Sequence, residues 1–121
     1  MIDHLFHRYR AIVQSFVLVV HPSFELDVKR HVGQLAPSLN VQYANQSQPT
    51  GMLDAILLAT DAAKQSGAER VWITWCDQIG VHPNTVSMLN RLSQERADAA
   101  VIFPTTRQQP PYIHLDRDDT A

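Results

Sequence analysis

The sequence is poor in the features that mark several large classes of protein. It has a single cysteine, Cys76, which excludes an internal disulfide and is typical of a buried, reduced thiol in a cytoplasmic protein. Ten Lys and Arg stand against twelve Asp and Glu, so the net charge of −2 provides no broad basic surface for nucleic acid. The longest strongly apolar run, Phe16–Val20, is too short to cross a membrane.

Common catalytic and metal-binding motifs are also missing. No GxSxG or Walker sequence is present, which argues against a serine hydrolase and a P-loop NTPase. Cys76 has no CxxC partner, so a catalytic thiol is not expected. His4 and His7 are three residues apart, but no nearby Cys or carboxylate completes a zinc site. These absences argue against a serine hydrolase, a P-loop NTPase, a catalytic cysteine and a zinc site.

What the chain does contain is an alternation of β-rich and helical patterns. Helices are expected over Met1–Ile12, from Pro22 to about Leu35, over Met52–Gln65 and from His82 onward. Strands are expected at Ser15–Val20 (buried on both faces), Asn40–Ala44, Arg70–Trp75 and Ala99–Phe103, with a short extended segment at Tyr112–Leu115. With 121 residues, this order predicts one α/β domain over residues 1–121, a mostly parallel sheet covered by helices on both faces.

Parallel sheets bind ligands beyond the carboxyl ends of their strands, which directs attention to the residues that follow each strand. Asp77 follows the predicted strand Arg70–Trp75, where its carboxylate is of the type that holds Mg²⁺ together with phosphate oxygens and water. The competing interpretation is that Asp77 caps the next turn through its own carboxylate. Position alone leaves both interpretations open.

The polar loop Asn45–Thr50 and the helix after it form a second candidate. Gly51 starts that helix, and a glycine there lets a flat ring or a phosphate approach the backbone amides. Gln46 and Gln48 carry side-chain amides that can read a base edge by paired hydrogen bonds. The alternatives are a plain loop-to-helix junction and solvated glutamines.

In order and spacing, the segments GMLDA (51–55), WCDQIGV (75–81) and HPNTV (82–86) resemble MobA-like and sugar-1-phosphate nucleotidyltransferases. The resemblance covers nearly the whole chain and implies a three-layer Rossmann-like fold. It places Gln46, Gln48, Gly51 and Met52 at the nucleotide and Asp77 at Mg²⁺, with Cys76 replacing the usual Gly. The implied reaction is attack of an acceptor phosphate oxygen on the α-phosphorus of a nucleoside triphosphate, with release of pyrophosphate.

The same resemblance implies differences from the family. Members of the family begin with a strand, a glycine-rich loop that carries an Arg, and a Lys, and we expect no counterpart of these ahead of Met1. We likewise expect no counterpart of the family's second metal ligand and sugar pocket before Ala121. We therefore expect a truncated domain that is inactive or nearly so alone. The alternatives are a standalone nucleotide-binding or protein-interaction module, and an unrelated small α/β protein. The last alternative would be a small protein with a receiver-like or Rossmann-like sheet. It is weakened because no acidic cluster follows the first predicted strand, where a receiver would need one.

The expected lack of the family's first strand predicts self-association. That strand would lie between Phe16–Val20 and Arg70–Trp75, so its absence would leave two unpaired edges and an apolar gap. We expect the gap to be closed by homo-oligomer formation, by a strand exchanged within a dimer, or by rearrangement of the sheet.

Overall fold

The computed structural model describes residues 1–106, so the extended segment predicted at Tyr112–Leu115 lies outside the described part of the chain. The structure divides into two compact units, Met1–Val81 and His82–Ala121.

The first unit is a mixed α/β unit built around two parallel strands. The adjacent strands β1 and β2 are in register from Ser15 opposite Asn40 to Val20 opposite Asn45. The Rossmann-like α/β class that the sequence predicted is confirmed. Its elements in chain order are α1 (Ile2–Tyr9), β1 (Ser15–Val20), α2 (Pro22–Leu35), β2 (Asn40–Asn45), α3 (Met52–Leu58) and α4 (Thr60–Gln65).

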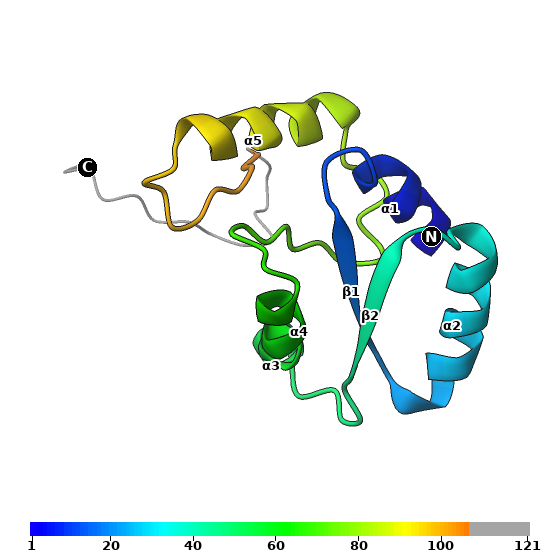
Figure 1. Cartoon of the computed structure of the whole chain (residues 1–121). Coiled ribbons are helices and arrows are strands. Elements are labelled where there is room, and N and C mark those ends of the chain that lie inside the picture. The colour runs from blue at the N-terminus through cyan, green and yellow to red at the C-terminus, as the bar shows by residue number, and fades with distance from the viewer. Residues whose placement is uncertain (107–121) are drawn as a thin grey trace. The chain divides into compact units, whose positions relative to one another are not determined.

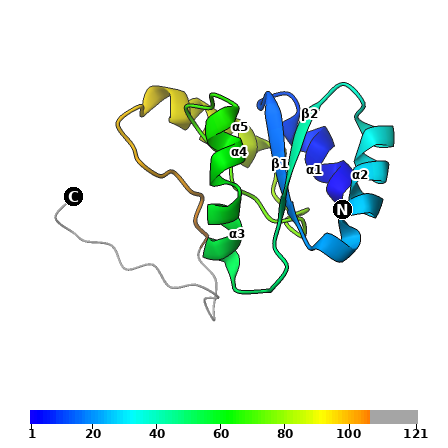
Figure 2. The same ribbon diagram turned by 60° about the horizontal axis from the view of Figure 1, so that its bottom comes forward.

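Helices cover both faces of this sheet. The ring of Phe6 in α1 lies 4.5 Å from the ring of Phe16 in β1, and Nζ of Lys29 in α2 lies 5.1 Å from the ring centre of Tyr43 in β2. Because alternate residues of a strand share a face, β1 residues 16, 18 and 20 face α1 and α2. Helices α3 and α4 lie on the opposite side of the strands (Figures 1 and 2).

The core of the first unit is small. Phe6, Tyr9 and Val32 are its buried hydrophobic side chains among the residues described. All six residues of β1 are half-buried, so the expectation of a strand buried on both faces is wrong. Within residues 1–106, β1 has only β2 beside it, so its second edge is open and its side chains remain partly exposed.

The start of α2 and the end of α1 are set by local hydrogen bonds. His21 caps α2, with Nδ1 accepting a hydrogen bond from the backbone N–H of Ser23 (3.1 Å), and Pro22 occupies the first turn. Helix α1 is shorter than the predicted Met1–Ile12, because the N–H groups of Ile12 and Val13 both bond to the carbonyl of Tyr9 in a closing turn.

The helix predicted over Met52–Gln65 is divided into α3 and α4. At the junction the N–H of Ala59 bonds to the carbonyl of Ile56, three residues back instead of four (3.1 Å). The hydroxyl of Thr60 donates to the same carbonyl (3.5 Å), a side-chain contact that bends helices. The prediction of one continuous helix is therefore wrong at this point, while its two ends are confirmed.

The predicted strand Arg70–Trp75 is also wrong, because this segment pairs with no other strand among residues 1–106. Its side chains still alternate in exposure, and Trp72 packs on Tyr9 of α1 with ring centres 5.3 Å apart. The backbone N–H of Trp75 is 3.4 Å from Oε1 of Gln78, which takes the place of a neighbouring strand. Cys76, expected to be a buried thiol, is free and exposed because it follows a segment outside the sheet.

The second unit contains α5 (Pro83–Glu95), whose buried side chains are Val86 and Leu89. Nδ1 of His82 accepts from the N–H of Asn84 (3.2 Å), so the predicted start of this helix is confirmed. The predicted strand Ala99–Phe103 is wrong, since these residues pair with no strand in the described part. Across residues 1–106, no helix is long and apolar enough to cross a membrane.

Candidate functional site

The candidate site is the loop that leaves the carboxyl end of β2 and enters α3 (Figure 1). The N–H of Gln46 donates to the carbonyl of Val20 (2.9 Å), so the ladder of the two strands continues one residue past β2. Because β1 and β2 are parallel, the loop and the start of α2 lie at the same edge of the sheet. The structure thus brings the candidates Gln46, Gln48, Gly51 and Met52 to the edge where ligands bind in such sheets.

Gln46 closes this loop. Its side-chain Nε2 donates to the carbonyl of Gly51 (3.2 Å) and to the hydroxyl of Thr50 (3.3 Å). Both amide protons of the side chain are thus used inside the loop, while its carbonyl oxygen has no partner among residues 1–106. Gln46 is half-buried, which suits a residue that shapes the loop and presents only an acceptor outward.

Gln48 and Met52 differ from Gln46 in being available to a ligand. The Gln48 side chain is exposed and makes no hydrogen bond within the described part of the chain, although its backbone carbonyl accepts from the N–H of Thr50 (2.8 Å). Met52 is 58% exposed at the first position of α3. The amide and the thioether therefore offer a polar and an apolar contact on the same short segment.

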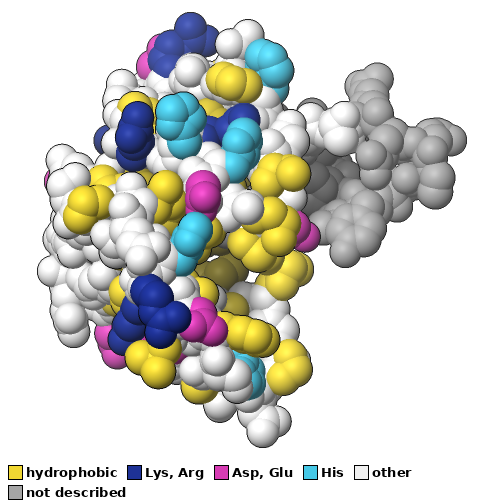
Figure 3. Space-filling model, turned by 90° about the vertical axis from the view of Figure 1, so that its right-hand side faces the viewer, with side chains coloured by type: hydrophobic (Ala, Val, Ile, Leu, Met, Phe, Trp, Pro, Cys, Tyr) yellow, Lys and Arg dark blue, Asp and Glu magenta, His cyan; other side chains and the backbone are white. Residues whose placement is uncertain are grey.

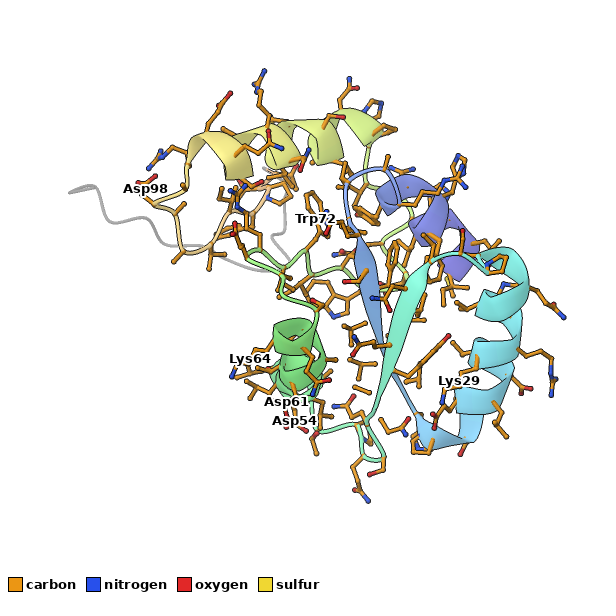
Figure 4. The ribbon with its side chains drawn as sticks, viewed as in Figure 1. Lys29, Asp54, Asp61, Lys64, Trp72 and Asp98 are labelled. Carbon is orange, nitrogen blue, oxygen red and sulfur yellow. The ribbon has the colours of Figure 1, made fainter. Side chains whose placement is uncertain are left out.

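Gly51 sets the direction in which the chain enters α3. Its φ of 119° is a conformation that residues with a Cβ rarely adopt, and open space surrounds the position a Cβ would take. Its carbonyl accepts from the N–H of Ala55 (3.2 Å) and so begins the helix. Thr50 and Asp54 are hydrogen-bonded to each other across this start, which places a carboxylate in the first turn (Figure 4).

A polar cluster that the sequence did not single out borders the same edge. Glu25 of α2 accepts from Nζ of Lys29 (2.5 Å) and from the side-chain amide of Asn45 at the end of β2 (2.9 Å). These hydrogen bonds, that of Lys29 above all, lower the pKa of the Glu25 carboxyl below its usual range. Lys29 reaches from α2 toward β2 (Figure 4), so the one ammonium described at this edge is already engaged.

Asp77 lies in a tight turn after the segment that packs on α1. Its backbone carbonyl accepts from the N–H of Ile79 (2.8 Å), and the carbonyl of Ile79 lies 3.1 Å from Nε2 of His4 in α1. The Asp77 side chain is exposed and makes no hydrogen bond among residues 1–106. The turn is organised instead by Gln78, whose side-chain oxygen accepts from the Thr74 hydroxyl (3.0 Å), so the structure gives no support to the capping role of Asp77.

The structure does not join Asp77 to the loop after β2. No hydrogen bond links the two places in the described residues, and no group of three His, Cys, Asp or Glu side chains there is arranged to hold a metal ion. The premise that Asp77 ends a strand of the sheet is wrong, while its role as a metal ligand stays a prediction. A lone exposed carboxylate can still serve Mg²⁺, which takes only one or two carboxylates when phosphate supplies further oxygens.

Comparison with known proteins assigns the family. The model of the MobA-like NTP transferase domain matches residues 1–119, so the chain belongs to this family and its function is of the nucleotidyltransferase kind. No curated protein and no solved structure matches the chain. The family match agrees with the resemblance that the loop, Gly51 and Asp77 carry in the sequence.

Proposed function

We propose that the chain binds a nucleoside triphosphate at the loop between β2 and α3, for transfer of its nucleotidyl group to a sugar phosphate or a similar phosphate acceptor. The observation that supports this most is the closed loop at the carboxyl edge, which Gln46 fixes from within and from which Gln48 projects. In this proposal Gln48 reads the base edge, the open backbone at Gly51 admits the ring, and Met52 packs against it.

We propose Asp77 as a ligand of Mg²⁺, since its carboxylate is exposed and makes no hydrogen bond in the described part of the chain. When bound, the ion would neutralise phosphate charge and so favour attack on the α-phosphorus. The residues of this chain would contribute by holding the base, orienting the ribose and phosphates, and keeping the loop in one conformation. The exposed free thiol of Cys76 fits a reducing compartment, and we propose the cytoplasm as the site of action.

We further propose that residues 1–121 alone bind nucleotide better than they transfer it. The described part of the edge carries the carboxylates of Glu25 and Asp54, and Lys29 is already paired with Glu25. Triphosphate charge would therefore meet little positive charge from these side chains, while transfer depends on neutralising it.

The test measures affinity and turnover together. Binding of each common nucleoside triphosphate is followed calorimetrically with and without Mg²⁺, and pyrophosphate release is followed with sugar phosphates as acceptors. Gln48→Ala is expected to weaken binding of the preferred nucleotide about tenfold, the loss of roughly one good hydrogen-bonded contact. Ser47→Ala, a change at the neighbouring exposed position, is expected to leave it unchanged.

For the metal, Asp77→Asn is expected to remove most of the Mg²⁺-dependent part of the affinity. Asp61→Asn is the matched control, because Asp61 is an exposed carboxylate on α4 (Figure 4). Equal binding by parent, Gln48→Ala and Asp77→Asn would reject the site. Clear binding without pyrophosphate release would instead identify a nucleotide-binding module that does not catalyse transfer.

A further inference from the structure

The outer edge of β1 is an unpaired strand edge. The carbonyl of Val20 points toward β2, where it accepts from Gln46, and peptide groups alternate in direction along a strand. The N–H and C=O groups of Val17 and Val19 therefore point away from β2. Within residues 1–106 they have no hydrogen-bond partner, so this edge can receive another strand.

This edge also lacks the devices that keep monomeric proteins from pairing. Edge strands usually carry a charged side chain, a proline or a bulge, whereas β1 reads SFVLVV and pairs in unbroken register over all six residues. Its side chains are uncharged, so two copies of β1 can lie side by side without like-charge repulsion. The edge is thus suited to pairing with itself.

Apolar side chains are also exposed in the segment that follows α4. Helix α1 contacts β1 through Phe6 on Phe16 and contacts this segment through Tyr9 on Trp72, so the segment and β1 pack against the same helix. The exposed fractions of its outward side chains are 62% for Val71, 49% for Ile73 and 39% for Trp75. Burial of these groups would stabilise any strand pairing at the β1 edge.

We propose that a second copy of this chain occupies the β1 edge. The two β1 strands pair antiparallel around a two-fold axis and make one continuous sheet in the order β2, β1, β1, β2. A two-fold axis requires that the same patch serve both partners, and an uncharged, unpaired strand meets that requirement. Val71, Ile73 and Trp75 add apolar contacts beside the new pair. This proposal does not depend on nucleotide binding.

Two measurements on the full chain test the proposal. Sedimentation equilibrium is expected to give a species of about 27 kDa, twice the 13.7 kDa of one chain, that dissociates on dilution. Amide hydrogen exchange is expected to show protection at Val17 and Val19 that is lost on the same dilution. The amide of Leu18, which faces β2, should stay protected throughout.

A variant pair checks the apolar contribution. Ile73→Lys is expected to raise the dimer dissociation constant by about tenfold or more, because it puts a charge into the interface. Leu26→Lys is the control: Leu26 is 76% exposed on α2, on a side where hydrophobic side chains are interspersed with charged ones (Figure 3). A monomer at every concentration would overturn the proposal. So would a dimer with fast exchange at Val17 and Val19, or protection that does not change on dilution.

Discussion

Among single residues, the two glycines Gly51 and Gly33 show how one residue type serves opposite purposes. Gly51 has a φ of 119°, whereas Gly33 lies inside α2 with ordinary helical geometry, and both have open space where a Cβ would be. At Gly51 a side chain would strain the backbone, while at Gly33 it would only restrict the unfolded chain.

We therefore predict changes of opposite sign. Gly51→Ala should lower the free energy of unfolding by about 1–3 kcal/mol, because the alanine must hold a φ of 119° with a ψ of 173°, a region that is essentially restricted to glycine. Gly33→Ala should raise it by about 0.5–1 kcal/mol, since alanine favours a helix interior. Urea unfolding followed by tryptophan fluorescence reports on the first unit, which contains both Trp72 and Trp75. Changes of the same sign in the two variants would contradict the backbone conformation at Gly51.

The sequence predicted part of the candidate site and missed the rest for a physical reason. Gln46, Gln48 and Gly51 could be found because they follow a strand that local pattern identifies. The hydrogen bond between Glu25 and Asn45 joins residues twenty positions apart, so no local sequence pattern predicts it. The Gln46 side-chain amide hydrogen-bonds within its own loop, whereas that of Gln48 does not. This difference depends on side-chain geometry, and the sequence alone does not distinguish the two glutamines.

At the scale of elements, α2 and α5 begin in the same way. Each starts at a His-Pro pair, with the histidine Nδ1 accepting from the N–H two residues later. This acceptor satisfies one of the free N–H groups at the helix start, and the proline fixes the first turn. Such signals are local, which explains why the starts of both helices were predicted correctly.

The His21 cap makes a testable contribution to α2. His21→Ala is expected to lower the free energy of unfolding of the first unit by about 1 kcal/mol, the usual effect of losing a cap. His21→Asn should recover most of this loss, because the asparagine oxygen accepts the same bond from Ser23. Tryptophan fluorescence in a urea titration measures both variants. Equal losses for alanine and asparagine would show that the imidazole ring, and not its acceptor atom, supports the helix.

Strands were less predictable than helix starts. Arg70–Trp75 has the β-branched and aromatic composition of a strand, and its side chains alternate in exposure as a strand's do. A strand nevertheless exists only where another strand supplies hydrogen bonds, and no strand in the described part of the chain does so here. β1 and β2 were predicted correctly because they pair with each other and are separated in sequence by a single helix. The exposure of Cys76 follows from the same missing partner.

For the molecule as a whole, stability at acidic pH is expected to depend on carboxylates that form hydrogen bonds between different helices and strands. Asp3 of α1 accepts from Nε2 of His31 in α2 (2.5 Å), and Glu25 joins α2 to β2. The hydrogen bond from His31 lowers the pKa of Asp3, and Lys29 with Asn45 lowers that of Glu25. Carboxyls with depressed folded-state pKa values stabilise the fold above their unfolded values, and this stabilisation is lost as the pH falls through the folded ones.

The resulting prediction concerns the urea midpoint of the first unit. It should fall as the pH drops below about 4.5, the unperturbed pKa of a glutamate such as Glu25. Glu25→Gln should flatten this fall and lower the midpoint at neutral pH, because the amide cannot attract Lys29 as a carboxylate does. Glu69→Gln is the control, since Glu69 makes no ion pair or hydrogen bond in residues 1–106. Identical pH profiles for parent and Glu25→Gln would assign acid sensitivity to other groups.

The exposed thiol of Cys76 has a practical consequence for study of the chain. It is the sole cysteine, and it stands next to Asp77 in sequence. A maleimide dye or nitroxide would therefore label one known position without any engineered substitution. Paramagnetic Mn²⁺ held by Asp77 would quench or broaden such a reporter at short range, and Asp77→Asn would abolish that signal. The chain thus carries its own attachment point for testing whether Asp77 holds a metal ion.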